Sequence, residues 1–226
     1  LFVSDASHEM KTPLAGIKLL TDSILQTENI DPATTREFVS DIGAEASRLE
    51  RITEDLLRLT RLDSGAVEPA VCVAVKPVLE RAARMLQPVA GQREVELTCR
   101  ADEAAAVRAT EGDVHQILYN LMENGVKYTA PGGFVHTSVS VEEGRVVITV
   151  SDNGIGIPAE DMPHIFERFY RVDKARSRQI GGTGLGLSIV GDTVQRRGGE
   201  IGVAPRKGGG TVFTVSFPQA EPEVTA

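Results

Sequence analysis

The chain of 226 residues is long enough for one or two domains with a buried core, and two unequal domains are expected. Its 32 Asp and Glu residues against 24 Lys and Arg residues give a formal charge of -8. This acidic balance argues against a general nucleic-acid or anionic-membrane surface, although a single nucleotide could still be held locally. The two cysteines, Cys72 and Cys99, form no CxxC pair, which favours reduced thiols and a cytosolic compartment.

A heptad pattern predicts a first helix near the N-terminus. Its seam positions alternate in steps of four and three residues, and they are Met10, Leu14, Ile17, Thr21 and Ile24. The pattern breaks at residues 28–32, where Asp31 is a candidate N-cap and Pro32 suits a first helical position. His8 lies ~160° around an ideal helix from the seam residue Met10, so it is expected to face solvent, with Thr12 on the same face.

A second helix with the same spacing ends at residues 63–65. Its positions that repeat in steps of three and four are Ile42, Glu45, Leu49, Ile52, Leu56 and Leu59. Two such helices form a hairpin, and one hairpin buries only part of its apolar stripes. Pairing with a second copy into a four-helix bundle buries the rest, so the sequence predicts a homodimer.

From residue 71 onward, short β-type runs alternate with helical segments. Strands are expected at 71–75, 95–99, 135–141, 146–151 and 211–217, and helices at 77–90 and 113–127. Mostly antiparallel strands with interleaved helices give an α/β sandwich, a sheet with helices on one face, so the whole chain is predicted to be α+β. The tail, residues 219–226, is rich in Pro and Glu and is expected to be disordered.

Two polar segments of this second region carry side chains suited to a cation and to a polar ligand. Asn120, Asn124 and Lys127 share one helical face by their i, i+4 and i+7 spacing. Amide oxygens suit a hard cation, and a nearby ammonium group suits phosphate. Asp152 begins a run with two glycines directly after a strand, where backbone can approach a ligand closely and the carboxylate can accept a hydrogen bond from an exocyclic amine.

Two further glycine-rich segments point to phosphate. Residues 181–190 run from glycines into an apolar helix start, whose free N–H groups suit phosphates. Residues 208–211, before the last strand, are the least specific. A lone glycine pair marks a turn more often than a phosphate site, but four such segments in one region reverse that preference. None is a Walker-type GxxxxGK[ST] loop, which excludes an ordinary P-loop enzyme.

Taken together, five motifs resemble those of the sensor histidine kinases of two-component signalling, in the order of that family. The H, N, G1, F and G2 boxes correspond to residues 7–14, 120–128, 152–158, 165–171 and 182–187. The match covers nearly the whole chain. It implies a dimerisation and phosphotransfer hairpin over residues 1–65 and an ATP-binding domain of the Bergerat type over residues 66–218, a fold shared with gyrase, mismatch-repair and chaperone ATPases.

The resemblance implies that His8 accepts the γ-phosphoryl group of ATP and passes it to an aspartate in the receiver domain of a response regulator. An imidazole needs one ring nitrogen free to attack while the other carries a proton. Glu9 can accept a hydrogen bond from that N–H, which raises the nucleophilicity of the attacking nitrogen. Residues 9–12 match the family pattern ExxT, which implies that Thr12 orients a water that dephosphorylates the regulator. Arg171 would neutralise the γ-phosphate during transfer.

The resemblance also implies a site for ATP and Mg²⁺. Asp152 would bind the adenine amine, and Asn124 would hold the metal ion. The residues implied in ATP binding are Asn120, Asn124, Lys127, Tyr128, Asp152, Gly154, Gly156, Ile157, Thr183, Gly184, Leu185, Gly186 and Leu187. Residues 172–181, rich in Arg, Lys and Ser, look like a mobile lid over the nucleotide.

The sequence also bears on the part of the protein that precedes this chain. Its longest apolar runs are far shorter than the ~20 residues of a membrane helix, so no membrane contact is expected within these residues. The chain begins without an initiator Met and almost directly on the H box. We therefore expect an upstream part that holds a sensor or an anchor in the bacterial cell membrane.

Two other functions fit part of the pattern. A Bergerat ATPase in which ATP drives a conformational clamp would not explain an H box on a heptad hairpin. A non-enzymatic scaffold with a degenerate nucleotide site disagrees with Asn124, Asp152 and the intact G2 box. Three residues depart from the commonest family wording: Gly125, Gly191 and Arg197. Gly191 is expected to weaken its helix by about 1 kcal/mol relative to alanine.

Overall fold

The computed structural model describes residues 2–27, 29–64, 68–173 and 182–220, and it divides into two compact units. Unit 1 comprises Leu1–Gly65 together with Arg168–Gly186, and unit 2 comprises Ala66–Glu167 together with Leu187–Ala226. Within the described ranges, no helix combines the length and the apolar character needed to cross a membrane. Most of the expected lid, residues 174–181, lies outside the described residues.

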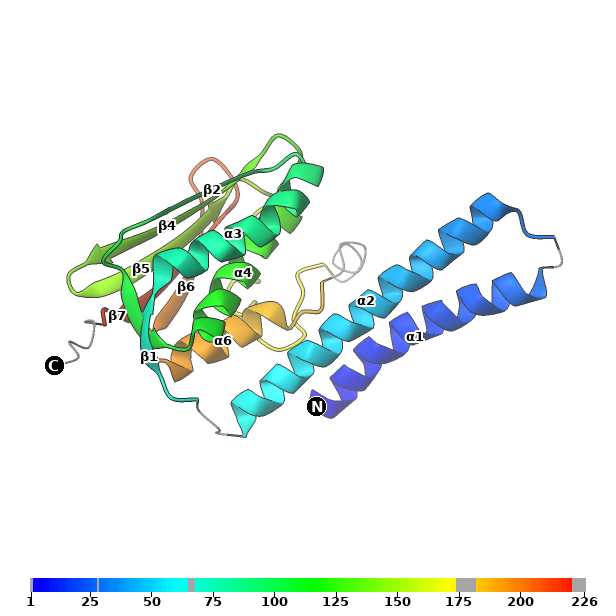
Figure 1. Ribbon diagram of the computed structural model, residues 1–226, viewed down its shortest axis with the longest axis horizontal. Coiled ribbons are helices and arrows are strands. Elements are labelled where there is room, and N and C mark those ends of the chain that lie inside the picture. Colours follow the sequence, from blue (N-terminus) through cyan, green and yellow to red (C-terminus); the bar gives the residue numbers. More distant parts are fainter. Residues whose placement is uncertain (1, 28, 65–67, 174–181, 221–226) are drawn as a thin grey trace. The chain divides into compact units, whose positions relative to one another are not determined.

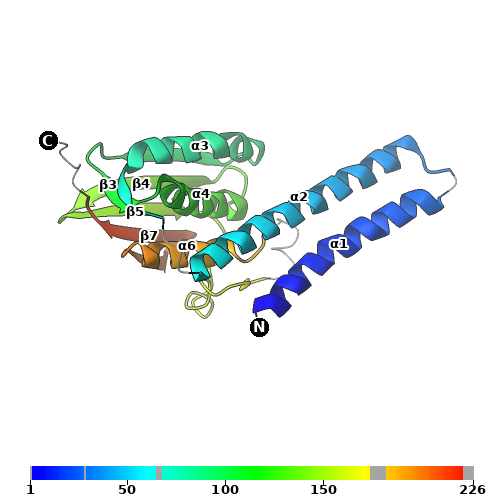
Figure 2. The ribbon, with the colours of Figure 1, turned by 60° about the horizontal axis from the view of Figure 1, so that its bottom comes forward.

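Unit 1 is built on a hairpin of two long helices, α1 (Phe2–Gln26) and α2 (Pro32–Asp63), which run side by side in opposite directions (Figures 1 and 2). Asp31 caps α2, because its Oδ1 accepts hydrogen bonds from the N–H groups of Ala33 at 2.9 Å and Thr34 at 3.0 Å. Pro32 begins the helix, where its missing N–H removes no helical hydrogen bond. The predicted hairpin and the predicted start of its second helix are thus confirmed.

Large apolar side chains lie exposed on this hairpin. They are between 37% and 78% exposed, and they are Met10, Leu14, Leu19, Leu25, Val39 and Leu57. Met10 and Leu14 belong to the predicted seam of the first helix, whereas the seam residues Ile52 and Leu59 of the second are fully buried. One hairpin by itself therefore leaves apolar surface that a partner would cover.

Unit 2 contains a five-stranded sheet with helices on one of its faces (Figures 1 and 2). In chain order its elements are β1 (Val71–Ala74), α3 (Val75–Gln92), β2 (Glu96–Ala101), β3 (Ala106–Ala109), α4 (Glu111–Tyr128), β4 (Phe134–Glu142), β5 (Arg145–Asp152), α6 (Gly186–Arg196), β6 (Glu200–Pro205) and β7 (Thr211–Pro218). The strand order is β2-β4-β5-β7-β6, with β2 parallel to β4 and the other neighbours antiparallel. This arrangement confirms the predicted α/β sandwich.

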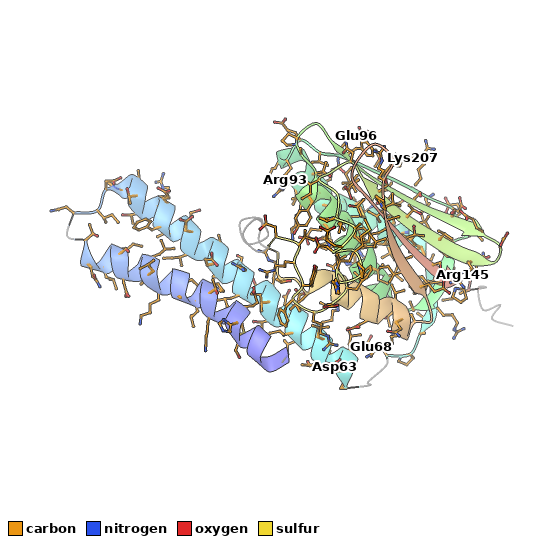
Figure 3. All side chains as sticks on the ribbon, turned by 180° about the vertical axis from the view of Figure 1, so that it is seen from behind. Asp63, Glu68, Arg93, Glu96, Arg145 and Lys207 are labelled. Atoms are coloured by element: carbon orange, nitrogen blue, oxygen red, sulfur yellow. The ribbon has the colours of Figure 1, made fainter. Side chains whose placement is uncertain are left out.

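The buried face of β5 leads directly to Asp152. Val146, Ile148 and Val150 alternate along this strand and are at most 1% exposed. The period of two puts Asp152 on the same face. Asp152 pairs with Val135 of β4, next to Phe134, the partner of Glu96. It therefore lies at the end of the sheet where Figure 3 labels Glu96, opposite the end marked by Arg145.

Two strands, β3 and β6, were not predicted, and β3 also orders the start of the C-terminal tail. The N–H of Ala220 donates to Ala106 O at 2.8 Å, and Gln219 forms an isolated bridge with Val107. These two residues of the expected disordered tail are therefore held at the edge of β3. Residues 221–226 lie outside the described part of the chain.

Arg197, one of the departures from the family wording, joins three segments of unit 2. Its Nε donates to Asp113 Oδ2 at 2.8 Å and its Nη1 donates to Glu68 O at 3.0 Å. Asp113 is itself part of the N-terminal cap of α4, since its N–H donates to Thr110 Oγ1 at 3.1 Å. Arg197 thus ties the end of α6 to the start of α4 and to the segment that precedes β1.

Candidate active site

Asp152 is a buried carboxyl group, 6% exposed, held by two backbone donors. Its Oδ1 accepts hydrogen bonds from the N–H of Gly154 at 2.8 Å and the N–H of Thr211 at 3.3 Å. Burial raises the pKa of Asp152 above its ordinary value of 3.8, and these two bonds and the charge of Arg206 partly oppose that rise. The two bonds do not use Oδ2, which suits it to accept a hydrogen bond from a bound amine.

Three chain segments meet around Asp152. The N–H of Ile155 donates to Tyr128 O, at the end of α4, at 3.2 Å. A Cβ atom on Gly154 would lie 2.4 Å from the same carbonyl oxygen. Gly210, whose φ is +96°, would place a Cβ atom 2.0 Å from the backbone O of Asp152. Both glycines are therefore required by close backbone contact between the end of α4, the end of β5 and the start of β7.

Asn153, which was not among the predicted site residues, fixes the loop after β5. Its Oδ1 accepts a hydrogen bond from the N–H of Phe134 at 2.7 Å, and its own N–H donates to Phe134 O at 3.3 Å. Gly156, with φ of +74°, and Ile157 continue the same loop and are half-buried. An asparagine between Asp and Gly is typical of a turn, so Asn153 could have been identified from the sequence.

The predicted residues of α4 lie along its C-terminal half. Asn120 is 8% exposed, and Asn124 and Tyr128 are half-buried. Lys127 Nζ lies 3.0 Å from Glu123 Oε2, and their side chains are 16% and 23% exposed. A phosphate bound by Lys127 would therefore have to share the ammonium group with Glu123. The i, i+4 spacing could have identified Glu123 from sequence.

The donor set of unit 2 bears on how a metal ion would be held. Across the described residues, no group of three or more His, Cys, Asp or Glu side chains is arranged to hold a metal ion. The amides of Asn120 and Asn124 fit a site in which Mg²⁺ takes one or two protein oxygens and completes its shell with phosphates and waters.

In unit 1, His8 lies in α1 with its side chain exposed, as its helical position predicts. Glu9 beside it is half-buried. Thr12, one turn later and also exposed, donates its hydroxyl to His8 O at 3.4 Å. The imidazole is thus accessible to a reaction partner from solvent, with a carboxylate and a hydroxyl among its nearest neighbours in the helix.

Glu9 is paired with an arginine distant in sequence. Arg171 Nη2 donates to Glu9 Oε2 at 2.7 Å, and the Arg171 side chain is only 5% exposed. Arg48 of α2, not among the predicted site residues, places its Nη2 3.5 Å from the same oxygen. The structure thus brings two predicted catalytic residues, Glu9 and Arg171, into contact, and Glu9 is the neighbour of His8 in the sequence.

Two more contacts attach residues 168–186 to the hairpin within unit 1. Arg168 donates two hydrogen bonds to the carboxylate of Asp63, which Figure 3 labels near the end of α2, at 2.7 Å and 2.9 Å. Thr183 Oγ1 donates to Asp55 Oδ2 at 2.9 Å and accepts from the N–H of Leu185 at 3.2 Å. In this structure the hydroxyl of Thr183 therefore bonds a carboxylate of α2.

Gly184 is required by a tight contact with the F box. Its φ is +75°, and a Cβ atom there would lie 3.0 Å from Phe169 Cα. Its carbonyl O accepts a hydrogen bond from the N–H of Phe169 at 2.9 Å. Gly186 and Leu187 form the first turn of α6. The G2 box thus packs directly against the F box before the helix begins.

Two family models match the chain. The model described as His Kinase A (phospho-acceptor) domain matches residues 1–65. The model described as histidine kinase-, DNA gyrase B-, and HSP90-like ATPase matches residues 109–221. The first contains His8 and Glu9, and the second contains Asn124 and Asp152.

Curated sensor histidine kinases are similar to this chain over nearly its whole length. The sensor-like histidine kinase SenX3 of Mycolicibacterium smegmatis is 36% identical over 219 residues, which cover 96% of this chain and 57% of that protein. The probable sensor histidine kinase TcrY of Mycobacterium tuberculosis is 39% identical over 217 residues, which cover 96% of this chain and 45% of that protein. The chain thus spans about half the length of these two relatives.

Solved structures show the same fold. The crystal structure of full-length ShkA in complex with AMPPNP has a TM-score of 0.71 at 29% identity, covering 95% of this chain and 44% of that one. The crystal structure of histidine kinase ThkA in complex with response regulator protein TrrA has a TM-score of 0.78 at 22% identity, covering 97% of this chain and 61% of that one. This chain matches both family models in this order and resembles curated sensor histidine kinases. It therefore belongs to the sensor histidine kinases of two-component signalling.

Proposed function

We propose that this chain is the kinase part of a two-component sensor, which phosphorylates itself on His8 with ATP and passes the phosphoryl group to an aspartate of a response regulator. In this proposal residues 1–65 are the dimerisation and phosphotransfer hairpin, residues 66–218 are the ATP-binding domain and residues 219–226 are a tail. The observation that supports it most directly is the exposed His8 beside a carboxylate that already engages a buried arginine.

The chemistry at His8 follows from its neighbours. The unprotonated ring nitrogen attacks the γ-phosphorus of ATP, the N–P bond forms, the bond to the β,γ-bridging oxygen breaks, and ADP leaves. Glu9 accepts a hydrogen bond from the other ring N–H, which raises the nucleophilicity of the attacking nitrogen. The product is a phosphoramidate, whose phosphoryl group is reactive enough to move to a carboxylate.

The nucleotide site is proposed at the end of β5. Asp152 Oδ2 would accept a hydrogen bond from the adenine amine, while Gly154 and Gly156 would let the base approach the backbone. Tyr128 and Ile157 would pack near the base, and the segment from Thr183 to Leu187 would face the phosphates. The family match over residues 109–221 and the AMPPNP complex of ShkA support a nucleotide ligand of this class.

Charge stabilisation is the main demand of phosphoryl transfer. Mg²⁺, when bound with ATP, neutralises phosphate charge. Asn124 would hold the ion with Asn120 in support, and the half-buried Lys127 would contact a phosphate in competition with Glu123. Arg171 would leave Glu9 to neutralise the transferring γ-phosphoryl group.

The hairpin is proposed to form a homodimer through a four-helix bundle. The exposed apolar residues of α1 and α2, among them Met10, Leu14 and Leu57, support this because they would be covered by a second copy. The ThkA complex, which contains the response regulator TrrA, supports a receiver domain as the second partner.

The direct test is labelling. The protein is incubated with γ-labelled ATP and Mg²⁺, and the label on the protein is tested for acid lability and alkali stability. We expect labelling of the wild type and of His164→Ala, whose exposed imidazole pairs with Glu167, and none of His8→Ala. Equal labelling of His8→Ala would contradict the proposal, and ATP hydrolysis without any labelled protein would favour the ATPase alternative.

A second activity, dephosphorylation of the regulator, is favoured by Thr12. Its hydroxyl is exposed one turn from His8 and bonds only weakly to the helix backbone, at 3.4 Å, so it could turn to orient a water. Thr12→Ala should keep autophosphorylation and lose acceleration of regulator dephosphorylation. Unchanged dephosphorylation by Thr12→Ala would remove this second activity and leave the kinase proposal untouched.

A further inference from the structure

Arg48 is a buried cation beside Glu9, the neighbour of His8 in the sequence. Its side chain projects from α2 and is 7% exposed. Its Nη2 lies 3.5 Å from Glu9 Oε2, and its Nη1 lies 3.9 Å from Glu45 Oε2. Both distances are those of ion pairs, and both are too long for a hydrogen bond with an arginine donor.

The hydrogen-bonding capacity of Arg48 is largely unused. Its Nε and Nη2 are buried and have no hydrogen-bond partner among the described residues, and the same holds for Glu45 Oε2. A buried guanidinium without hydrogen bonds is costly, because it has lost water without replacing it. We therefore expect these Arg48 donors to bond an acceptor near Glu9 in another conformation of the site.

We identify this acceptor as Glu9 Oε2, which Arg171 now occupies. Arg171 Nη2 takes the short hydrogen bond to Glu9 Oε2, at 2.7 Å, while Arg48 stands at 3.5 Å from the same atom. When Arg171 leaves to meet the γ-phosphoryl group, Glu9 Oε2 loses the shorter of its two arginine contacts. A shift of less than ~1 Å then gives Arg48 a charge-assisted hydrogen bond of ordinary length.

We propose that Arg48 is a positioning residue that takes over Glu9 Oε2 from Arg171 and so holds the carboxylate in place beside His8 during phosphoryl transfer. Oε2 then stays on Arg48, and the other carboxylate oxygen, Oε1, accepts the ring N–H of His8. The inference rests on the proposed function, in which Glu9 assists His8 and Arg171 meets the phosphate. It assigns Arg48 no contact with ATP.

The test compares Arg48→Met, Arg48→Lys and Arg51→Met by their rates of autophosphorylation over a range of ATP concentrations. Arg51 is exposed on the same helix, so its variant removes one charge near the site without a buried contact. Arg48→Met should lower kcat by about tenfold or more, the scale expected for a misplaced catalytic group. The KM for ATP should stay unchanged, Arg48→Lys should recover part of kcat, and Arg51→Met should match wild type.

A double-variant cycle with Glu9→Gln separates positioning from a structural role. If Arg48 acts through Glu9, Arg48→Met should change kcat less than twofold in the Glu9→Gln background. A full, multiplicative loss in that background overturns the inference, and so does a wild-type kcat for Arg48→Met. A kcat loss in Arg48→Met that Arg48→Lys does not relieve, accompanied by a lower melting temperature, also overturns it.

The same measurements distinguish this failure from failure of the proposed function. If Glu9→Gln labels as fast as wild type, the assistance of His8 by Glu9 is wrong and the inference falls with it. If Glu9→Gln is slow and Arg48→Met is not, the proposed function stands and only the role of Arg48 is lost.

Discussion

Arg171 and Glu9 are joined by a hydrogen bond of 2.7 Å between two side chains 162 positions apart in the sequence. The proposed phosphate-binding arginine thus lies on the proposed helper of His8. In the proposed function, Arg171 leaves Glu9 to meet the γ-phosphate, so nucleotide delivery exchanges one acceptor of this Nη2 for the other. The pair is 5% and 23% exposed, which makes that exchange a partly desolvated step.

Replacing Arg171 should therefore affect the chemical step more than nucleotide binding. Arg171→Met removes a charge aimed at the transferring group, and losses of about 100-fold to 1000-fold in kcat are typical of such groups. The KM for ATP should change by much less. Single-turnover labelling at saturating ATP measures this, and a kcat within twofold of wild type would show that Arg171 belongs only to the ion pair.

Asp152→Asn should separate nucleotide binding from folding. The asparagine oxygen can keep both bonds that Oδ1 now accepts, from Gly154 and Thr211, while an NH₂ donor replaces Oδ2. A donor facing the adenine amine should weaken binding of a non-hydrolysable ATP analogue by about 100-fold. Calorimetric titration measures the affinity, and a melting temperature no lower than that of the wild type excludes misfolding. If a folded Asp152→Asn variant still bound the analogue tightly, the adenine would not contact Asp152.

The raised pKa of Asp152 predicts a pH dependence of stability with a definite sign. Because burial raises this pKa, the folded protein holds the Asp152 proton more tightly than the unfolded chain does. The stability from Asp152 is therefore complete below its ordinary pKa of 3.8 and is lost as pH rises through the raised folded value. Against Asp152→Asn, the free energy of unfolding of the wild type should fall with rising pH in this window and then level off. Urea unfolding at a series of pH values tests this, and an opposite slope would contradict it.

Gly191 and Gly125 form a matched pair for a helix-propensity test. A Cβ atom on Gly191 of α6 would meet Phe166 at an ordinary 3.7 Å, so Gly191→Ala should raise the free energy of unfolding by about 1 kcal/mol. A Cβ atom on Gly125 of α4 would lie 3.0 Å from both methyl groups of Val135. Gly125→Ala should therefore gain less, or lose stability. Equal gains in urea unfolding would mean that Val135 yields without cost.

Arg197→Met should destabilise unit 2. It leaves the carboxylate of Asp113 without its close partner at 2.6 Å, with both side chains largely buried at 7% and 19% exposed. Breaking one half of such a pair costs about 3 to 5 kcal/mol. Asp113→Asn in the same chain should recover part of the loss, because the unpaired charge is then gone. Denaturant unfolding of the two variants checks this, and full additivity of their losses would argue against a coupled pair.

Local signals were predictable from sequence and long-range contacts were not. The cap formed by Asp31 and Pro32 depends on neighbouring residues, so the start of α2 was predicted correctly. The contact of Thr211 with Asp152 spans 59 positions, and it requires β5 and β7 to be neighbours, which strand patterns do not state. β3 is only four residues long, and β6 contains a glycine and ends at a proline, two residue types that are depleted in strands, so the sequence did not mark either as a strand. Arg48 is one polar residue among several on α2, and only the packing of the hairpin shows that it is buried.

The place of β7 in the sheet has a consequence for how the protein is made. β7 is the last strand in the chain, yet it lies between β5 and β6, and its first residue supplies the Thr211 donor to Asp152. During synthesis from N- to C-terminus, β5 and β6 leave the ribosome before the strand that has to sit between them. The nascent chain must therefore hold β6 apart, or release it, until β7 arrives. Until β7 is in place, Asp152 lacks its Thr211 donor, and the proposed nucleotide site is incomplete.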